Sequence, residues 1–414
     1  MKIITPKGTK DVLPENAYKW QYIENMIHNV CRTFGYKEIR TPVFEYTELF
    51  SRGIGDTTDV VQKEMFTFED KGGRSITLRP EGTAGAVRSY LENSLYANTQ
   101  PTKLYYTISC FRHEKPQAGR LRQFHQFGVE AFGSVSPAID AEIISLAMTF
   151  IRKLGIEKIT LNINSIGCPE CRKAYNQKLT DFFNGKEFCG TCLERLDRNP
   201  IRILDCKSPH CQSLATGAPK MLENLCEDCE THFEELKYLL TAMGINYNIN
   251  SGIVRGLDYY TRTVFEIVSD DIGAQGTVCG GGRYDGLVEE LGGNPTPGIG
   301  FGLGLERLLM VMDSLGIEIL EPEPVQLYIA NLGQEATAFA AKAVNDLRNN
   351  SIYADMDYMG RSLKAQMKYA DKVLAQKVLI IGEQELQDKK AKIKDMKSGA
   401  ETVISLENIE EAIQ

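Results

Sequence analysis

The sequence predicts an α/β protein whose larger part is an antiparallel sheet with flanking helices, an α+β arrangement. Strand-like segments at 104–111 and 123–130 flank a charged loop, which predicts an antiparallel hairpin. A cysteine-rich stretch at about 165–245 interrupts the strand pattern and predicts a helical insertion. Beyond a proline-containing linker at 321–324, a shorter α/β pattern begins. We therefore expect a main domain at 1–324 that carries the insertion, and a second domain at 325–414.

The composition of the 414-residue chain is that of a soluble globular protein with more than one core, because 43% of its residues are hydrophobic and 25% are charged. No apolar run reaches about 18 residues, so we expect no membrane span. The first residues include lysines but no apolar stretch, which predicts a cytoplasmic protein without a signal peptide. The net charge of −8 argues against a protein coated in nucleic acid but is compatible with a local basic patch.

The first regular element expected is an amphipathic helix at about 17–34. Ile23, Ile27 and Val30 recur at helical spacing, and Gly35 ends the pattern. The next segment, 37–44, predicts a strand. Pro42 places that strand at a sheet edge or a break, because proline cannot donate a hydrogen bond to a ladder.

The loop at 112–122 concentrates charge between the two hairpin strands, with four basic residues, one histidine and one acid. A guanidinium such as that of Arg112 or Arg120 can bind phosphate oxygens through two parallel hydrogen bonds. Gly119 would let the loop approach a ligand closely. The alternative interpretation of this loop alone is a solvated, charged hairpin tip.

A second candidate for ligand binding is the strand expected at 298–304, which becomes a helix through Met312. Glycines alternate along this strand. Gly300, Gly302 and Gly304 share one face, which weakens a strand unless something flat needs that face bare. A nucleobase is one candidate, with Arg307 stacking on it or meeting phosphate. The alternative is tight packing of the strand under a helix. Neither a P-loop nor a dinucleotide-binding fingerprint is present.

Together these segments resemble the class II aminoacyl-tRNA synthetases. Their motif 2, a strand, F-R-x-E, a loop and a strand, is matched by Phe111-Arg112-His113-Glu114. Their motif 3, G-x-G-x-E-R, is matched at 302–307, and the helix and proline-bearing strand of motif 1 are matched around Pro42. The class II sheet, and a homodimer built on motif 1, are implied by this resemblance.

Within that class the segment 255–266, Arg-Gly-Leu-Asp-Tyr-Tyr-Thr-Arg-Thr-Val-Phe-Glu, resembles the histidine-specific motif of the histidyl-tRNA synthetases. The segments 78–83, 122–126 and 279–285 are similar to the same family. The resemblance covers nearly the whole chain outside the cysteine insertion. Thr261 stands where many members carry asparagine, a small departure.

The resemblance implies a ligase that activates L-histidine with ATP, forming histidyl-adenylate and pyrophosphate. The enzyme would then transfer histidine to the 3′ end of tRNA(His). Mg²⁺ would bridge the ATP phosphates. Positioning and positive charge would carry most of the catalysis, since the reaction needs little protein acid–base chemistry.

The family's site residues map onto this chain as follows. Arg112 and Arg255 would act on the α-phosphate, and Arg112, Glu114 and Arg307 would hold ATP. Carboxylates, hydroxyls and amides suit the ammonium and imidazole of histidine as hydrogen-bond partners. On their own, the two tyrosines of the motif would more often be core residues. The residues expected to contact histidine are Glu81, Gly82, Thr83, Gln126, Glu130, Tyr259 and Tyr260.

Eight of the eleven cysteines lie in four close pairs within the insertion. Cys168-x2-Cys171, seventeen residues and then Cys189-x2-Cys192 fit the spacing of a zinc site. Such sites would be structural zinc, and a helical insertion with free thiols is the alternative. The order in sequence does not say which pairs share a metal. The candidate ligands are Cys168, Cys171, Cys189, Cys192, Cys206, Cys211, Cys226 and Cys229.

A basic stripe is expected in the second domain, because Arg361, Lys364, Lys368 and Lys372 follow helical steps. Such a stripe would supply salt-dependent contacts to RNA phosphates, or it is an ordinary solvated face. The segment 361–372 resembles the anticodon-binding domain shared by several class II synthetases. The resulting candidates for tRNA contact are Arg120, Arg361, Lys364 and Lys368.

Two rival functions share parts of this pattern. The regulatory subunit of ATP phosphoribosyltransferase, a non-catalytic relative in histidine biosynthesis, has the same catalytic fold. It normally lacks both the anticodon domain and the intact histidine motifs, which are present here. A synthetase for proline or threonine would lack the segment 255–260.

Overall fold

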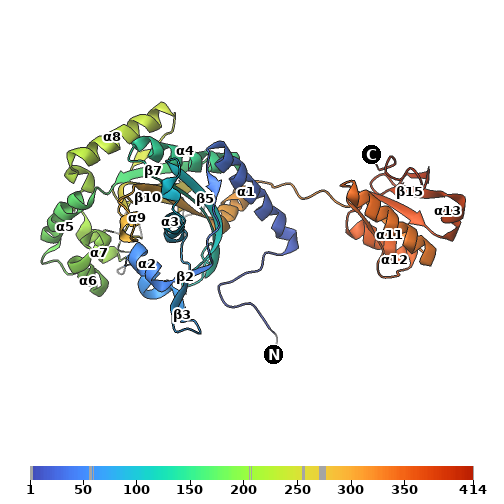
Figure 1. Cartoon of the computed structure of the whole chain (residues 1–414), viewed down its shortest axis with the longest axis horizontal. Coiled ribbons are helices and arrows are strands. Elements are labelled where there is room, and N and C mark those ends of the chain that lie inside the picture. Colours follow the sequence, from blue (N-terminus) through green and yellow to red (C-terminus); the bar gives the residue numbers. More distant parts are fainter. Residues whose placement is uncertain are drawn as a thin grey trace. The chain divides into compact units, whose positions relative to one another are not determined.

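The structure, a computed structural model, describes residues 3–55, 58, 60–204, 206, 208–253, 257–269 and 277–413. It comprises two compact units, Met1–Ile319 and Leu320–Gln414 (Figure 1). Among the described helices, none combines the length and the apolar character needed to cross a membrane.

An eight-stranded sheet forms the centre of the first unit, in the order β1-β5-β6-β11-β10-β9-β7-β8 (Figure 1). The six inner strands run antiparallel, and the two short outer strands add parallel edges. The antiparallel sheet and the hairpin expected from the sequence are confirmed. The strands are β1 (Lys37–Glu38), β5 (Thr102–Phe111), β6 (Gln123–Phe132), β7 (Ile159–Ser165), β8 (Asn248–Ile249), β9 (Thr261–Ser269), β10 (Thr277–Arg283) and β11 (Gly298–Gly304).

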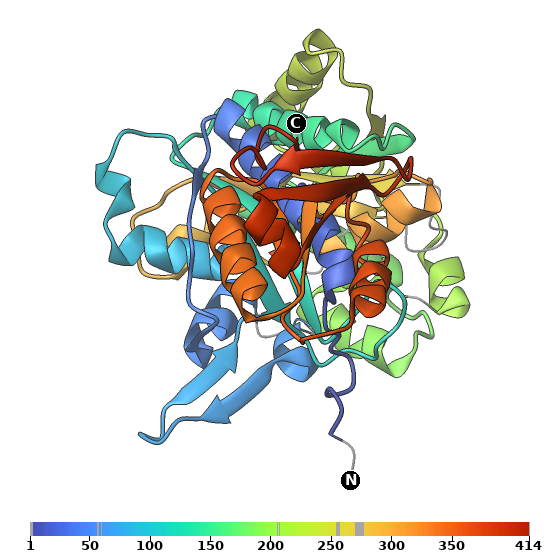
Figure 2. The same cartoon turned by 90° about the vertical axis from the view of Figure 1, so that its right-hand side faces the viewer.

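The expected first helix is present as α1 (Pro14–Thr33), with proline in its first turn and Ile23, Ile27 and Val30 buried. The single strand expected at 37–44 is wrong. β1 ends at Glu38, and β2 (Phe44–Tyr46) belongs to a separate three-stranded sheet with β4 (Ser75–Leu78) and β3 (Phe66–Glu69). Pro42 lies at the break, because its ring removes the N–H that a continuous ladder would require. In both views the hairpin of β3 and β4 projects from the unit (Figures 1 and 2).

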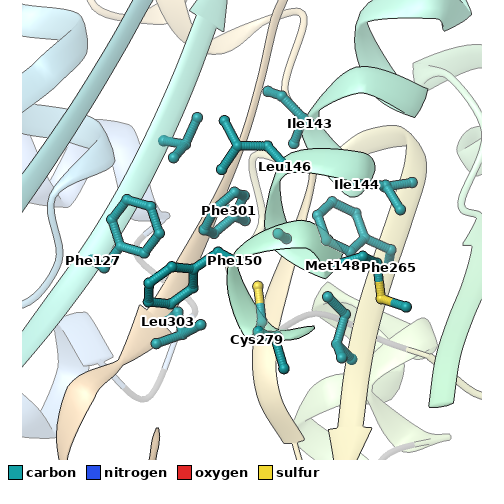
Figure 3. Packing of buried hydrophobic residues seen from close by; sticks show 14 of the residues in the cluster. Phe127, Ile143, Ile144, Leu146, Met148, Phe150, Phe265, Cys279, Phe301 and Leu303 are labelled. Carbon is teal, nitrogen blue, oxygen red and sulfur yellow. The ribbon is translucent and has the colours of Figure 1, made fainter. Parts of the chain in front are cut away.

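The large sheet has one apolar face, which packs into the core, and one face that carries most of the polar site residues. Odd-numbered residues of β6 and β11, among them Phe127, Phe301 and Leu303, pack against the helix α4 (Pro137–Lys153), which contributes Leu146 and Phe150 (Figure 3). Because side chains alternate along a strand, the even-numbered residues of the same strands point to the opposite face. Most of the site residues described below come from that second face.

The insertion is helical, as expected. It consists of α5 (Pro169–Phe183), α6 (Gly190–Arg198), the 3₁₀ turn η3 (Pro200–Ile203), α7 (Pro209–Ala215), the turn η4 (Met221–Asn224) and α8 (Glu227–Ala242). Its buried residues form a small core of their own in which cysteines pack with Tyr175, Leu179 and Phe183. The helix α8 leads back into the main core and packs against α4.

The second unit has a five-stranded sheet in the order β13-β12-β14-β15-β16, which confirms the α/β pattern expected (Figure 2). Separate apolar clusters cover its two faces, one with α11 and the other with α12. The elements are β12 (Leu327–Asn331), α11 (Gln334–Asn349), β13 (Ala354–Met356), α12 (Leu363–Lys372), β14 (Lys377–Ile381), α13 (Glu383–Asp388), β15 (Lys390–Asp395) and β16 (Glu401–Ser405).

Candidate active site

A buried carboxylate, Glu130 of β6, is the centre of a polar pocket. Thr83 Oγ1 donates a 2.9 Å hydrogen bond to Glu130 Oε1, and Tyr106 OH donates a 2.8 Å bond to the same oxygen. Tyr284 OH donates to Glu130 Oε2. Burial raises the pKa of Glu130 to about 8, although the three hydroxyl donors act in the opposite direction. A cationic group entering this pocket would therefore meet a carboxyl group that is ready to ionise beside it.

A second buried acid, Glu81, lies beside Glu130 and orders the start of the helix α3 (Thr83–Glu92). Its carboxylate accepts hydrogen bonds from the backbone N–H groups of Thr83 and Ala84 at 2.6 and 2.8 Å. Burial raises the pKa of Glu81, and these bonds oppose the shift. Two adjacent buried acids disfavour one another's ionisation, so the pocket favours a ligand that brings positive charge.

Glycines of β11 make room for the polar side chains of β6. A Cβ atom on Gly300 would lie 1.9 Å from Glu130 Oε2, and one on Gly302 would lie 2.3 Å from Gln126 Nε2. Gly300 is opposite Glu130 in the ladder, whereas Gly302 is opposite Gly128, and the Gln126 side chain reaches over it from the neighbouring pair. Of the two interpretations of the alternating glycines, close packing applies to Gly300 and Gly302, but against the neighbouring strand and not under a helix, and the bare face for a ligand stays a prediction. Gly300 and Gly302 clear space for Glu130 and Gln126, whereas Gly304 lines an open cavity.

Tyr259 and Tyr260 close the apolar side of this pocket. Their ring centroids are 4.6 Å apart, and the Tyr259 ring meets Tyr284 edge-on at 5.6 Å. Burial, followed by the nearby Tyr260 hydroxyl and Glu81 carboxylate, raises the pKa of Tyr259 well above 10. Tyr259 is thus a neutral hydroxyl beside the acids. Tyr260 is also buried and packs with Val264 and other core residues.

A cavity of about 390 Å³ adjoins this polar pocket. Arg112, Glu114, Arg120 and Arg307, all singled out from the sequence, line it together with Gln126. Gln126 therefore connects the two sites, since its Oε1 also accepts a 3.1 Å hydrogen bond from Gly82 N–H. Of the described lining residues, five are arginines and three are glutamates, so the cavity suits an anionic ligand.

The guanidinium of Arg112 lies between the cavity and the acidic pocket. Its Nε donates to the carbonyl oxygen of Pro80 at 2.9 Å, and the group lies 5.4 Å from the centre of the Phe124 ring. Arg307 Nη1 donates to Thr277 O at 3.0 Å. Burial and the neighbouring positive charges of Arg120 and Arg112 lower the pKa of Arg307. Cations crowded in this way are stabilised by an anion among them.

The loop 112–122 is held in place and does not extend as a free hairpin tip. The N–H of His113 donates to Glu64 O at 2.7 Å, and the N–H of Arg122 donates to Gly8 O at 2.8 Å. Gly119 has a φ of +69°, and a Cβ there would lie 3.1 Å from the Arg307 side chain. Its lack of a side chain therefore brings the loop close to Arg307.

Glu306, which the sequence analysis left without a role, holds the strand beneath the cavity. Both carboxylate oxygens accept from the His125 N–H at 3.0 Å, and Oε1 lies 2.9 Å from His125 Nδ1. The acid of the G-x-G-x-E-R segment thus joins α10 (Leu305–Ser314) to the start of β6. This contact fixes the arginine next to it, Arg307, at the cavity wall.

Arg255 and Gly256, the first residues of the histidine-specific segment, lie outside the described residues. The part of the segment that is described begins at Leu257. Asp258 is held from the insertion, since its Oδ1 lies 3.3 Å from both Arg202 Nε and Asn199 Nδ2. Its backbone oxygen accepts from Arg172 Nη1 at 3.3 Å.

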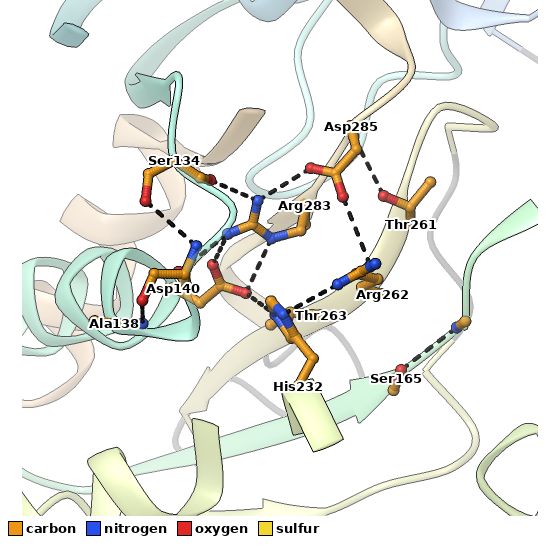
Figure 4. Close-up of polar contacts among 12 residues, drawn as sticks. Ser134, Ala138, Asp140, Ser165, His232, Thr261, Arg262, Thr263, Arg283 and Asp285 are labelled. Atoms are coloured by element: carbon orange, nitrogen blue, oxygen red, sulfur yellow. Dashed lines mark hydrogen bonds and ion pairs between the residues drawn. The ribbon is translucent and has the colours of Figure 1, made fainter. Parts of the chain in front are cut away.

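Behind the pocket, a buried polar network joins α4, α8, β9 and β10 (Figure 4). Arg283 is entirely buried and pairs with Asp140, which also accepts from His232 Nε2 at 2.8 Å. Arg283 Nη1 bonds Asp285 at 3.0 Å, and the N–H of Asp285 donates to Thr261 Oγ1 at 3.2 Å. The network therefore fixes the strand end that carries Tyr284, and with it one donor to Glu130.

The insertion cysteines gather into two tetrads. One comprises Cys168, Cys171, Cys226 and Cys229, and the other comprises Cys189, Cys192, Cys206 and Cys211. Within each tetrad the sulfurs lie within 4.8 Å of one another. The first and last pairs in sequence thus enclose the two middle pairs. The zinc-site spacing noted between the first pair, Cys168 and Cys171, and the second, Cys189 and Cys192, does not correspond to one site, because the two pairs belong to different tetrads.

The basic residues of the second unit are only partly arranged as expected. Lys364, Lys368 and Lys372 are exposed on α12. Arg361 does not continue their stripe, because α12 begins at Leu363. Arg361 pairs instead with buried Asp357 at 2.7 Å and lies over the Tyr369 ring.

Tyr106 and Tyr284 are site residues that the sequence analysis missed. Tyr106 is opposite Gly128 in the hairpin, and a Cβ on that glycine would lie 2.2 Å from the Tyr106 ring. The pairing of a large aromatic residue with glycine on the same face as Glu130 was a usable signal once the hairpin register was known. No comparable local signal pointed to Tyr284, which follows β10 and reaches Glu130 of β6 across the intervening strand β11.

Comparison with known proteins finds relatives over the whole chain. A family model described as histidyl-tRNA synthetase matches residues 8–308, and one described as anticodon binding domain matches residues 326–414. A histidine–tRNA ligase of Acetivibrio thermocellus is 59% identical over 406 residues, which cover 98% of this chain and 97% of that protein.

Other relatives agree across the full length. A histidine–tRNA ligase of Clostridioides difficile is 52% identical over 99% of this chain and 98% of its own length. The crystal structure of the apo histidyl-tRNA synthetase of Staphylococcus aureus superimposes with a TM-score of 0.86 at 42% identity, and it covers 100% of both chains.

Proposed function

The chain belongs to the histidyl-tRNA synthetase family, and from that premise we propose which of its residues perform each step of the family's reaction. It is an enzyme, a histidine–tRNA ligase, which activates L-histidine with ATP and transfers it to tRNA(His). The rival regulatory subunit is not favoured, because relatives at 52–59% identity over nearly the whole chain are ligases.

One observation supports the assignment of the substrates to the two sites. Gln126 lies at their boundary, touching the Gly82 backbone on one side and lining the arginine-rich cavity on the other. A polar pocket with two buried acids suits the ammonium and imidazole of histidine, and the cavity suits a nucleoside triphosphate. The carboxylate of histidine and the α-phosphate of ATP would meet at this boundary, near Arg112.

In the histidine pocket, Glu81, Thr83 and Glu130 would bind the ammonium group, with Gly82 leaving room beside Tyr106. Tyr259, Tyr260 and Gln126 would surround the imidazole. A site of this kind discriminates strongly, because an analogue without the ring nitrogens leaves buried polar groups unpaired.

In the cavity, Arg112, Glu114 and Arg307 would hold ATP. Arg112 and Arg255 would neutralise the charge that builds on the α-phosphate during attack. Mg²⁺ is commonly bound by phosphate oxygens of the substrate together with one or two carboxylates of the protein. The carboxylates of Glu64 and Glu114 line the same cavity and provide a suitable donor set.

Histidine-dependent ATP–pyrophosphate exchange, measured with each of the twenty amino acids, tests the function. Exchange with histidine alone is expected. Exchange with another amino acid, or none with histidine, would contradict the proposal. Arg255→Ala is expected to abolish exchange while the circular dichroism spectrum and thermal unfolding stay those of the parent. Near-normal exchange in that variant would remove Arg255 from the mechanism.

For tRNA binding, we assign Lys364 and Lys368 of α12 as phosphate contacts, with Arg361 supporting the loop before them. Arg120 of the cavity loop would contact the tRNA 3′ end. Charge reversal of Lys364 and Lys368 should raise the KM for tRNA and reduce its salt dependence. Exchange without tRNA should not change.

For the cysteine tetrads we propose two structural zinc ions. Zinc bound to four thiolates at about 2.3 Å has sulfur–sulfur distances of about 3.8 Å. Sulfur distances of 3.6 Å for Cys168–Cys171, 3.9 Å for Cys168–Cys226 and 4.0 Å for Cys189–Cys206 fit this spacing and are far too long for disulfides. Four protein ligands leave no open position, so the ions would stabilise the insertion without a part in the reaction.

We further propose that the enzyme is a cytoplasmic homodimer. A reducing compartment would keep the eight insertion thiols available for metal. Next to the motif 1 segment, Val43, Phe44 and Tyr46 are exposed, and clustered apolar side chains of this kind mark protein interfaces. Analytical ultracentrifugation at micromolar concentration is expected to give twice the mass of one chain, and a monomer would contradict the assignment.

A further inference from the structure

Two arginines of the insertion, Arg195 and Arg202, line the same cavity as Arg112 and Arg307. They come from the cysteine-rich insertion, whereas the other cavity residues come from the catalytic sheet, its loops and the helices at its edges. The insertion therefore contributes part of the wall of the nucleotide site.

The two arginines are fixed to one another and to the histidine-specific segment. Arg195 of α6 donates from Nη1 to the backbone oxygen of Arg202 in η3 at 3.1 Å. Arg202 Nε lies 3.3 Å from Asp258 Oδ1, with the Arg202 side chain only 11% exposed. Asn199, between the two elements, also bonds Asp258 Oδ1 at 3.3 Å. The arm formed by α6 and η3 thus docks directly before Tyr259.

The second cysteine tetrad encloses this arm in the sequence and in space. Cys189 and Cys192 lie at the start of α6, one turn before Arg195, and Cys206 follows η3, four residues after Arg202. The Cys189 N–H donates to Cys211 Sγ at 3.4 Å, which ties the two ends together. Closure of the tetrad therefore limits how far either arginine can move from the cavity.

Charge indicates what the arm binds. Of the three described glutamates that line the cavity, Glu114 pairs with Arg120 at 3.3 Å and Glu306 binds His125, and the five described arginines of the lining outnumber all three acids. Adding Arg195 to Arg112 and Arg307 surrounds the cavity with guanidinium groups from three separate parts of the chain. This arrangement matches several phosphate groups on one ligand, because each guanidinium can form two hydrogen bonds to phosphate oxygens.

We infer that the α6–η3 arm is a phosphate-binding part of the active site, in which Arg195 binds the triphosphate of ATP and Arg202 positions the arm on Asp258. This inference rests on the proposed use of the cavity for ATP. It assigns to the insertion a role in the activation step, before tRNA takes part.

Histidine-dependent ATP–pyrophosphate exchange of the full-length enzyme tests the inference. Arg195→Ala is expected to raise the KM for ATP by on the order of 10-fold, the loss expected for a charged hydrogen bond, with the KM for histidine nearly unchanged. Arg195→Lys should recover part of that loss. The matched control is Lys173→Ala, which removes an exposed positive charge from the same insertion outside the cavity.

Arg202→Ala separates positioning from binding. It is expected to raise the KM for both ATP and histidine, because Asp258 precedes Tyr259 of the histidine pocket. Thermal unfolding of each variant should stay close to that of the Lys173→Ala control.

The remaining outcomes are distinct. If Arg195→Ala has the same KM for ATP in exchange as the control, the inference is wrong. If in that case only aminoacylation is impaired, Arg195 contacts tRNA phosphate instead of ATP. If the parent enzyme itself shows no exchange with histidine, the proposed function fails first.

Discussion

Thr83, at the first turn of α3, and Glu130, in the middle of β6, are joined by a 2.9 Å hydrogen bond in the interior of the protein. The two residues are 47 positions apart, and Glu81 orders the turn from which Thr83 extends. The helix start and the strand thereby form one acidic pocket. We expect the protonation of this pocket to affect the binding of histidine proposed above.

Glu130→Gln should remove a pH dependence of both stability and histidine binding. Burial raises the pKa of this carboxyl from its ordinary 4.5 to about 8. Between those values the folded protein keeps a proton that the unfolded chain releases. The free energy of unfolding therefore falls as pH rises, by at most about 1.4 kcal/mol per pH unit from this group.

In the parent, the KM for histidine should fall as pH rises from 6 towards 8, because the ammonium group requires an ionised partner. In Glu130→Gln the KM should rise on the order of 10- to 100-fold and lose that dependence. Exchange kinetics from pH 6 to 9 and urea unfolding at the same pH values provide the two measurements. A pH-independent KM in the parent would contradict the assignment.

Gly300→Ala should disrupt the histidine pocket, whereas Gly304→Ala should leave the fold intact. A Cβ at 300 would lie 1.9 Å from Glu130 Oε2 and 2.4 Å from the Val129 backbone oxygen, while a Cβ at 304 would have nothing within 4 Å. We expect Gly300→Ala to lower the free energy of unfolding by about 1–3 kcal/mol and to abolish exchange. Urea titration gives the free energy of unfolding of both variants. Equal values would contradict the prediction, because they would show that the strand shifts at little cost to accommodate the new Cβ atom at 300.

Asp140→Asn should destabilise the protein strongly, because it removes the fully buried one of the two carboxylates that pair with the Arg283 guanidinium and leaves only Asp285. We expect a loss of about 3–5 kcal/mol in the free energy of unfolding. The matched control is Asp346→Asn, which removes an exposed helical ion pair with Lys342 and should have no measurable effect.

The same pair predicts acid sensitivity. Burial opposes ionisation of Asp140, but the hydrogen bond from His232 and the charge of Arg283 lower its pKa below the ordinary 3.8. Its contribution to stability is therefore present above that value and is lost as pH falls through the lower, folded value. Asp140→Asn should unfold with a shallower pH dependence in strong acid, and an unchanged acid transition would argue against the pair.

Metal analysis of the purified enzyme should find about two zinc ions per chain. Cys171→Ser and Cys192→Ser alter different tetrads, so each should lower the content by about one, and the double variant should hold none. Cys31→Ala, which changes a buried cysteine outside both tetrads, is the control. Well under one zinc in the parent would favour free thiols.

The sequence by itself determined the motifs and their local structure. Arg112, Glu130 and Arg307 could be assigned roles because the residues around them match a known family. Strand alternation placed Gln126 and Glu130 on one face. These are local properties, since alternation and turn chemistry depend on neighbours a few residues away.

Only the tertiary structure decided which distant segments complete the site. Tyr284 reaches Glu130 across the sheet, and the cysteine pairs close in a nested order. Arg202 of the insertion meets Asp258 of the catalytic unit. Two expectations from local spacing also failed. The segment 37–44 is not one strand but is interrupted around Pro42, and Arg361 lies before the helix α12 and not on it. The physical reason is that strand register and the packing of distant segments are decided by burial between parts of the chain far apart in sequence. The short-range periodicity of a sequence does not determine these contacts.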